Sequence, residues 1–207
     1  MIVARRATVD EAPVIARTLA GALSQDPAAT FPFPPGQADD RLESEFIAYD
    51  APAAEFGWLW TTEPHIAGAL WVPPGFDDEF ITISDSVGDA LGAMNELEHA
   101  RFDAFWSWIE THRPAEPHWY LDHIGVAVGH RGEGHGFRLI EAGLDLADED
   151  HAPAFLITST PGNVGYYERF GFVVTHMGSA PVGSPIIWAM VRPPARINRA
   201  AVPPATG

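Results

Sequence analysis

The sequence predicts one α/β domain, and three patterns carry this prediction. An apolar strand at 120–128 runs through a glycine-rich turn into an amphipathic helix at 137–150. Two short strand-like runs, 56–63 and 66–74, are separated by a turn and indicate a hairpin. Two further strand-like runs lie near the end of the chain. With 207 residues and no internal repeat, the chain is long enough for a single domain with its own apolar core.

The elements before the hairpin follow from capping and breaker signals. Residues 2–8 read as a strand, and Thr8 or Asp10 is placed to cap a helix that ends near Leu23. Prolines then predict a loop at 26–40, and aspartates at its end open a second helix at 41–51.

The elements after the hairpin are predicted in the same way. Residues 84–112 look helical, and 113–117 form a proline-containing spacer before the strand at 120–128. The remaining elements are a strand at 154–160, a short helix at 164–169 and two strands at 170–177 and 185–192. We expect the domain to occupy 1–192 and residues 193–207 to form a flexible tail.

Composition excludes several classes of function. Acidic residues outnumber basic ones by 28 to 12, and the net charge of −16 disfavours nucleic acid and anionic membranes as partners. The chain has no cysteine and hence no thiol nucleophile, and its nine histidines show no metal-ligand spacing, so no metal is expected. No signal peptide or apolar run long enough to span a membrane is present, which predicts a cytoplasmic protein.

The turn after the strand at 120–128 has the properties of an anion-binding device. Arg131, Gly134 and Gly136 lie between a strand and a helix, where glycines allow close approach and the first N–H groups of the helix point at a phosphate. The turn lacks the Gly-Lys-Ser/Thr sequence of a Walker loop. The next strand also does not end in the acidic residue that a dinucleotide fingerprint requires.

Together with a second motif, this turn resembles the acyl-CoA-binding core of the GNAT (GCN5-related) N-acetyltransferases. Within the family, the segment 112–175 is most similar to the puromycin N-acetyltransferase type of actinomycetes. The residues that carry the resemblance are Val126, Arg131, Gly134 and Gly136, and then Asn163, Tyr166, Tyr167, Glu168, Arg169, Gly171 and Phe172.

The resemblance implies both a fold and an activity. The fold is a mixed, mostly antiparallel sheet flanked by helices, with a splayed central pair of parallel strands. The activity is acetyl transfer from acetyl-CoA to a primary amine of a small molecule, such as an aminoacyl-nucleoside or another antibiotic-like acceptor, which would confer antibiotic resistance. A protein or peptide N-acetyltransferase and a non-catalytic acyl-CoA-binding protein remain open as alternatives, as does a homodimer.

The same resemblance assigns a set of residues to acetyl-CoA. Backbone groups of 126–128 are expected along the pantetheine arm, the 131–136 turn around the pyrophosphate, and Asn163 near the thioester. The expected cofactor-binding residues are Val126, Ala127, Val128, Arg131, Gly132, Glu133, Gly134, His135, Gly136, Asn163 and Tyr167. Three of them depart from the family pattern: Val128 replaces a proline, Glu133 a basic residue and His135 an apolar one.

Two residues are candidates for proton transfer. Tyr167 is expected to protonate the departing thiolate. Asp122, nine residues before Arg131, is expected to accept the proton of the amine, with water as the alternative base. Alternation along the strand places Tyr120 on the face of Asp122 and turns His123 away from it, to a packing role.

Aromatic residues are candidates for the walls of the acceptor site. Phe31 and Phe33 lie in the proline-rich loop, and Trp119 and Tyr120 lie at the start of the strand. We expect these four side chains to bind the acceptor.

Overall fold

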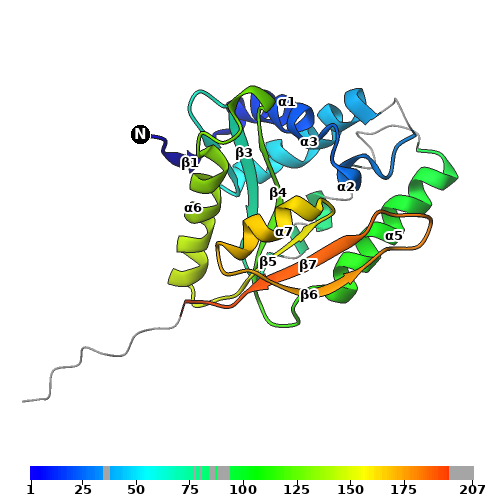
Figure 1. Ribbon diagram of the computed structural model, residues 1–207. Helices are drawn as coiled ribbons and strands as arrows, with labels where there is room; N and C mark the ends of the chain where they lie inside the picture. Colours follow the sequence, from blue (N-terminus) through cyan, green and yellow to red (C-terminus); the bar gives the residue numbers. More distant parts are fainter. Residues whose placement is uncertain (35–37, 77, 80, 84–86, 88–93, 196–207) are drawn as a thin grey trace, which may run out of the picture.

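The computed structural model describes residues 1–34, 38–76, 78–79, 81–83, 87 and 94–195, with the side chains of 38–40 left aside. In this part of the chain, seven strands form one sheet in the order β1-β2-β3-β4-β5-β7-β6 (Figure 1). The strands are β1 (Ala4–Arg6), β2 (Leu59–Thr62), β3 (Ala67–Val72), β4 (Trp119–Val126), β5 (Ala154–Thr158), β6 (Val173–Gly178) and β7 (Ile187–Arg192). Of the neighbouring pairs only β4–β5 is parallel, which confirms the expected sheet.

The parallel pair opens partway along its length. β4 and β5 pair only from Trp119 opposite Ala154 to Leu121 opposite Leu156, although β4 continues to Val126. Beyond this point the two strands diverge, as the predicted splay requires. The opening separates backbone groups that would otherwise bond across the sheet, and it places them at the edge of two cavities.

Helices cover both faces of the sheet. Helices α1 (Ala12–Leu23), α3 (Ala38–Glu55) and α5 (Glu96–His112) pack on one face, and α6 (His135–Glu149) and α7 (Pro161–Glu168) pack on the other (Figure 1). The remaining helical segments are short: α2 (Pro27–Thr30) and the 3₁₀ turns η1 (Val9–Glu11) and η2 (Val128–His130). Of the helices in the described ranges, none is both long and apolar enough to cross a membrane.

A β-bulge in β4 changes the expected orientation of its side chains. Leu121 lies opposite Trp71 and His123 lies opposite Leu70, so Asp122 is an extra residue without a partner on β3. The bulge interrupts the two-residue alternation, and Asp122 and His123 therefore both face the α3 side, as Tyr120 does. The prediction that His123 turns away from Asp122 was wrong for this reason.

Other departures from the predicted elements are local. The segment 26–40 was expected to be a loop, but it contains α2, whose first N–H groups, those of Ala28 and Ala29, donate to the carboxylate of Asp26. Helix α5 begins at Glu96 after the N-cap Asn95. Residues 84–86 and 88–93 of the expected 84–112 helix lie outside the described residues, as does the predicted tail from residue 196 onward.

Candidate active site

Two cavities meet where β4 and β5 diverge. One, which we call the loop cleft, runs from the turn at 130–137 to Tyr167. The other, which we call the aromatic cavity, is lined from α2, α3, α5, β4 and β5. Leu23, Asp26, Ile124, Asn163 and Tyr167 line both. A ligand in one cavity can therefore reach a ligand in the other at this junction.

The turn at the closed end of the loop cleft has a conformation that requires glycine. Gly132 has φ +85° and Gly134 has φ +103°, and an L side chain at either position would be strained. The N–H groups that open α6 directly after Gly134 have no intrahelical acceptor. A Cβ on Gly136 would lie 3.4 Å from a methyl group of Val126, an ordinary contact, so the requirement for glycine rests on positions 132 and 134. Free amides and the positive end of a helix fit a pyrophosphate.

The side chains around the turn hold its shape. Arg131 Nη2 donates to the carbonyl oxygen of Ala22 at 2.8 Å and so fastens the turn to the end of α1. His135 is buried, and its Nδ1 lies 2.6 Å from Thr62 Oγ1. Glu133 Oε2 lies 3.2 Å from Nδ1 of the exposed His130 and 3.6 Å from Nε2 of the buried His135, so its carboxylate stays beside the turn.

Three of the expected cofactor residues do not line the loop cleft, although they adjoin it. Val128 is 67% exposed, because the chain leaves the sheet after Val126 and Val128 begins the η2 turn. The N–H of Ala127 donates to the carbonyl of Ile66, so it cannot also donate to a ligand. The carboxylate of Glu133 lies beside His130 and His135 and is not part of the cleft lining. Conversely, Arg169 lines the cleft with its guanidinium 5.6 Å from the ring centroid of Tyr166, and no role was assigned to it from sequence.

Tyr167 lies at the junction of the two cavities. Its side chain is almost fully buried, and burial raises the pKa of its hydroxyl, so that this group keeps its proton at neutral pH. The neighbouring Asn163 is 3.5 Å from Thr158 Oγ1 at the end of β5. The arrangement supplies a hydrogen-bond donor at the junction.

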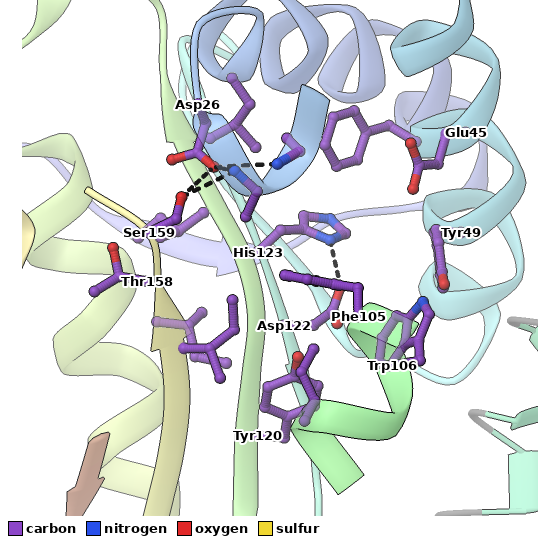
Figure 2. Close-up of a pocket in the computed structure, with 18 of the residues that line it drawn as sticks. Asp26, Glu45, Tyr49, Phe105, Trp106, Tyr120, Asp122, His123, Thr158 and Ser159 are labelled. Carbon is purple, nitrogen blue, oxygen red and sulfur yellow. Dashed lines mark hydrogen bonds and ion pairs between the residues drawn. The ribbon is translucent and has the colours of Figure 1, made fainter. Parts of the chain in front are cut away.

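Asp26 bridges the two sides of the splay. Its Oδ1 accepts from the N–H groups of Ala28 and Ala29 and from Ser159 Oγ at 3.2 Å (Figure 2). Its Oδ2 accepts from Thr160 Oγ1. The start of α2 is thereby tied to the residues that follow β5. Sequence reasoning missed this residue, because its only visible signal was that of an aspartate before a proline.

The aromatic cavity takes its walls mainly from α3 and α5. Figure 2 shows Tyr49 on α3, Phe105 and Trp106 on α5, and Tyr120 on β4 around one space. Further apolar lining comes from Phe46, Phe102, Ile109 and Ile157.

Only Tyr120 of the four expected acceptor-wall residues lines this cavity. Trp119 faces the α6 side, one residue out of phase with Tyr120, and its Nε1 donates to Asp150 at 2.9 Å. Phe33 is buried in the α1–α3 core with Arg41 stacked over its ring. Phe31 contacts the wall residue Phe105 at 6.4 Å between ring centroids without lining the cavity itself. The prediction that Trp119 and Phe33 form walls was wrong, because both side chains fill cores.

A chain of buried polar groups crosses the side of the cavity that lies against α3. His123 Nδ1 lies 2.7 Å from Asp122 Oδ2, and His123 Nε2 lies 3.0 Å from Asp50 Oδ1. Burial would lower the pKa of His123, but Asp50 and Asp122 outweigh it and raise that pKa to about 10. His123 is therefore an imidazolium at neutral pH, and both of its nitrogens donate.

Two further titratable groups line the cavity beside this chain. Burial, with a contribution from Asp122, raises the pKa of Glu45 to about 8, and its Oε2 is buried without a hydrogen-bond partner in the described structure. Burial and then Asp122 hold the pKa of Tyr120 well above its usual range, so its hydroxyl stays protonated. The sequence analysis assigned no role to Glu45 and only a packing role to His123.

A splayed parallel pair with a glycine turn at one end and a buried tyrosine at the other defines an acyl-CoA-dependent transferase. Residues 22–172, more than half of the chain, match the model of the acetyltransferase (GNAT) family. The chain belongs to this family of acetyl-CoA-dependent N-acetyltransferases, and the free amides and glycine cradle of the turn fit that cofactor.

Known proteins share this fold at low sequence identity. A histone acetyltransferase HPA2 and related acetyltransferase from Corynebacterium glutamicum superposes with a TM-score of 0.65 at 22% identity, covering 95% of this chain and 98% of that one. A polyamine N-acetyltransferase from Drosophila melanogaster superposes with a TM-score of 0.57 at 15% identity, and the match covers 93% of this chain and 100% of that one. A chain of the NatC complex bound to Gag peptide and CoA superposes with a TM-score of 0.56 at 12% identity, and the match covers 93% of this chain and 98% of that one.

A match at higher identity is short. An uncharacterized N-acetyltransferase of Schizosaccharomyces pombe is 38% identical over 55 residues, which span 27% of this chain and 22% of that protein. The acceptor and partners of this chain are therefore not carried over from that relative.

Proposed function

We propose that this enzyme transfers the acetyl group of acetyl-CoA to a primary amine of a small molecule bound in the aromatic cavity. The observation that carries the proposal is the junction at Tyr167, where the loop cleft meets a cavity walled by helices and by the diverging strands β4 and β5. Such a cavity suits a compact acceptor, whereas a protein or peptide substrate would call for a long open groove.

In this proposal the residues of the loop cleft bind acetyl-CoA, which supplies the acetyl thioester. Arg131, Gly132, Gly134, His135 and Gly136 surround the pyrophosphate, mainly through backbone N–H groups. Val126 lies along the pantetheine arm, and Asn163 and Tyr167 lie at its end. Arg169 adds a second guanidinium to the cleft and helps to neutralise the phosphates.

Tyr167 and Asp122 take the two proton-transfer roles. The buried hydroxyl of Tyr167 carries a proton that it can deliver to the departing thiolate. Asp122 lines the aromatic cavity on β4 and accepts the proton of the amine, directly or through a water. The bulge and the imidazolium of His123 hold the Asp122 carboxyl in place.

The resemblance to the puromycin type extends the proposal to aminoacyl-nucleosides and other antibiotic-like amines, whose rings would stack on the aromatic walls. An amine screen that follows thiol release and product mass tests both the acetylation of small amines and its extension to antibiotic-like amines. Simple alkylamines, puromycin and peptides with free N-termini form its three arms. Acetylation of peptides alone would contradict the small-molecule proposal, and acetylation of no amine would contradict the activity.

A further inference from the structure

The side of the aromatic cavity against α3 holds more acidic than basic side chains. Glu45, Asp50 and Asp122 are three acids around one resident base, His123. The other cation near Glu45 is Arg41, and its Nη1 already bonds to Glu98 Oε1 at 2.6 Å while its guanidinium stacks on Phe33. The acids therefore lack a full complement of cations among the described residues.

Two carboxyl oxygens of this cluster have no partner. Asp50 is completely buried, and its Oδ2 makes no hydrogen bond in the described structure. Glu45 lines the cavity, and its Oε2 is also buried without a hydrogen bond to any described residue. A buried carboxylate without a partner is costly, because it loses hydration and gains nothing in return, and the raised pKa of Glu45 reflects this cost. A ligand that brings a positive nitrogen to Glu45 would supply the partner that its ionised form lacks.

The position of Glu45 separates it from the acetyl-transfer junction. In Figure 2, Glu45 lies across the cavity from Thr158 and Ser159, which end β5 beside the junction. Tyr49, Phe105 and Trp106 line the same space, with Tyr49 on the side of Glu45. A positive charge at Glu45 is thus not the amine that reacts, and the aromatic walls suit an apolar chain that joins the two nitrogens.

We propose that Glu45, supported by the Asp50–His123–Asp122 chain, binds a second cationic nitrogen of the acceptor, so that the preferred substrate is a primary amine with another positive charge at the end of a short apolar spacer. This inference rests on the proposed small-molecule acceptor and specifies its class. Diamines and aminoalkylguanidines meet the description.

The kinetic test compares α,ω-diamines of three to six carbons with n-alkylamines of equal length. The wild type is expected to favour the diamine in kcat/KM, and Glu45→Gln is expected to lower the diamine-to-monoamine ratio by about tenfold to a hundredfold, the usual worth of a charge-assisted hydrogen bond. Glu43→Gln is the matched control: it removes a carboxylate from the same helix that lies off the cavity lining, and it leaves the ratio unchanged.

A binding test needs no catalysis. At pH 7 Glu45, with its pKa of about 8, is mostly protonated, and a cation beside it lowers that pKa and releases a proton. The groups that face Glu45 are Asp122 and His123 on β4 and Arg41 on its own helix. Calorimetry of a diamine with the protein–CoA complex, in buffers of different ionisation enthalpy, should show this release for the wild type and not for Glu45→Gln.

The outcomes separate the two proposals. If no amine is acetylated but the wild type binds diamines with proton release that Glu45→Gln abolishes, the proposed activity fails and the cation site stands. If monoamines and diamines are acetylated equally well and diamine binding releases no proton, the cation site is overturned while the activity stands. If Glu45→Gln does not fold, the comparison of diamines with monoamines in the wild type still tests the cation site.

Discussion

Tyr167 is the residue on which the proposed chemistry most directly depends. Tyr167→Phe removes one hydroxyl and keeps the buried ring, so folding and acetyl-CoA binding should persist. Loss of a positioned acid lowers the turnover number by about 10²–10⁴. Steady-state kinetics with the best amine, and calorimetry of acetyl-CoA, measure the two effects. Tyr166→Phe is the control, and a turnover number for Tyr167→Phe within about threefold of wild type would exclude the role.

Asp122 is the second residue with a proposed role. Asp122→Asn keeps the shape of the bulge and an oxygen that can accept from His123, but it removes the basicity and the negative charge. We expect a lower kcat and an altered acidic limb of the pH–rate profile, with acetyl-CoA affinity unchanged. Asp145→Asn, on α6 away from both cavities, is the control. An unchanged profile would assign the base role to water.

At the scale of elements, the turn before α6 is the part that defines the cofactor site. Gly134→Asp forces a side chain onto a left-handed backbone and places a charge at the pyrophosphate, so acetyl-CoA affinity should fall more than about tenfold, or 1.4 kcal/mol. Gly129→Asp adds the same charge a few residues earlier, where φ is not left-handed and the space is open. Equal affinities of the two variants in calorimetry would contradict the assignment.

The end of α6 is joined to β7 by a two-pronged ion pair. Arg192 donates to both oxygens of Asp148 at 2.7 and 2.8 Å, and these bonds outweigh burial and lower the pKa of Asp148. Arg192→Met should reduce the free energy of unfolding by about 1–3 kcal/mol at pH 7. Because the folded pKa lies below the unfolded value of about 3.9, this contribution is present above that pH and is lost as the pH falls through the folded pKa.

Urea titrations at pH 7 and near pH 3 measure this difference. Arg138→Met is the control, because its pair with Glu141 is solvent-exposed and such pairs contribute about 0–1 kcal/mol. A loss for Arg192→Met that is as large at pH 3 as at pH 7 would show that packing, not the ion pair, is responsible.

Comparison of sequence and structure shows where periodicity is informative. The strands, α6 and the glycine turn were predictable, because their hydrophobic period and their glycines are local signals. His123 was misplaced because a bulge is set by pairing with β3, which no local pattern reveals. Trp119 and Phe33 were taken for walls because a sequence does not show which aromatic side chains a neighbouring element will cover. Glu45 was missed since its burial depends on β4, far along the chain.

For the whole molecule, the acidic balance of charge should affect association with the acceptor. The net charge of −16 attracts cations at long range, and salt screens this attraction as the Debye length falls from about 30 Å at 0.01 M to about 3 Å at 1 M. We expect kcat/KM to fall with added salt, more steeply for a diamine than for a monoamine. Equal slopes for the two amines would rule out long-range attraction as a factor.

The homodimer stays a prediction.

The bulge at Asp122 has a consequence for engineering. Tyr120, Asp122 and His123 line the aromatic cavity, whereas Trp119, Leu121 and Ile124 pack in the core on the α6 side, and Leu121 and Ile124 reach the cavity lining as well. A change of acceptor by design is therefore best directed at Tyr120, because changes at 122 or 123 would also break the buried chain to Asp50. Deleting residue 122 would remove the proposed base, make His123 follow Leu121 directly and bring β3 and β4 into uninterrupted register.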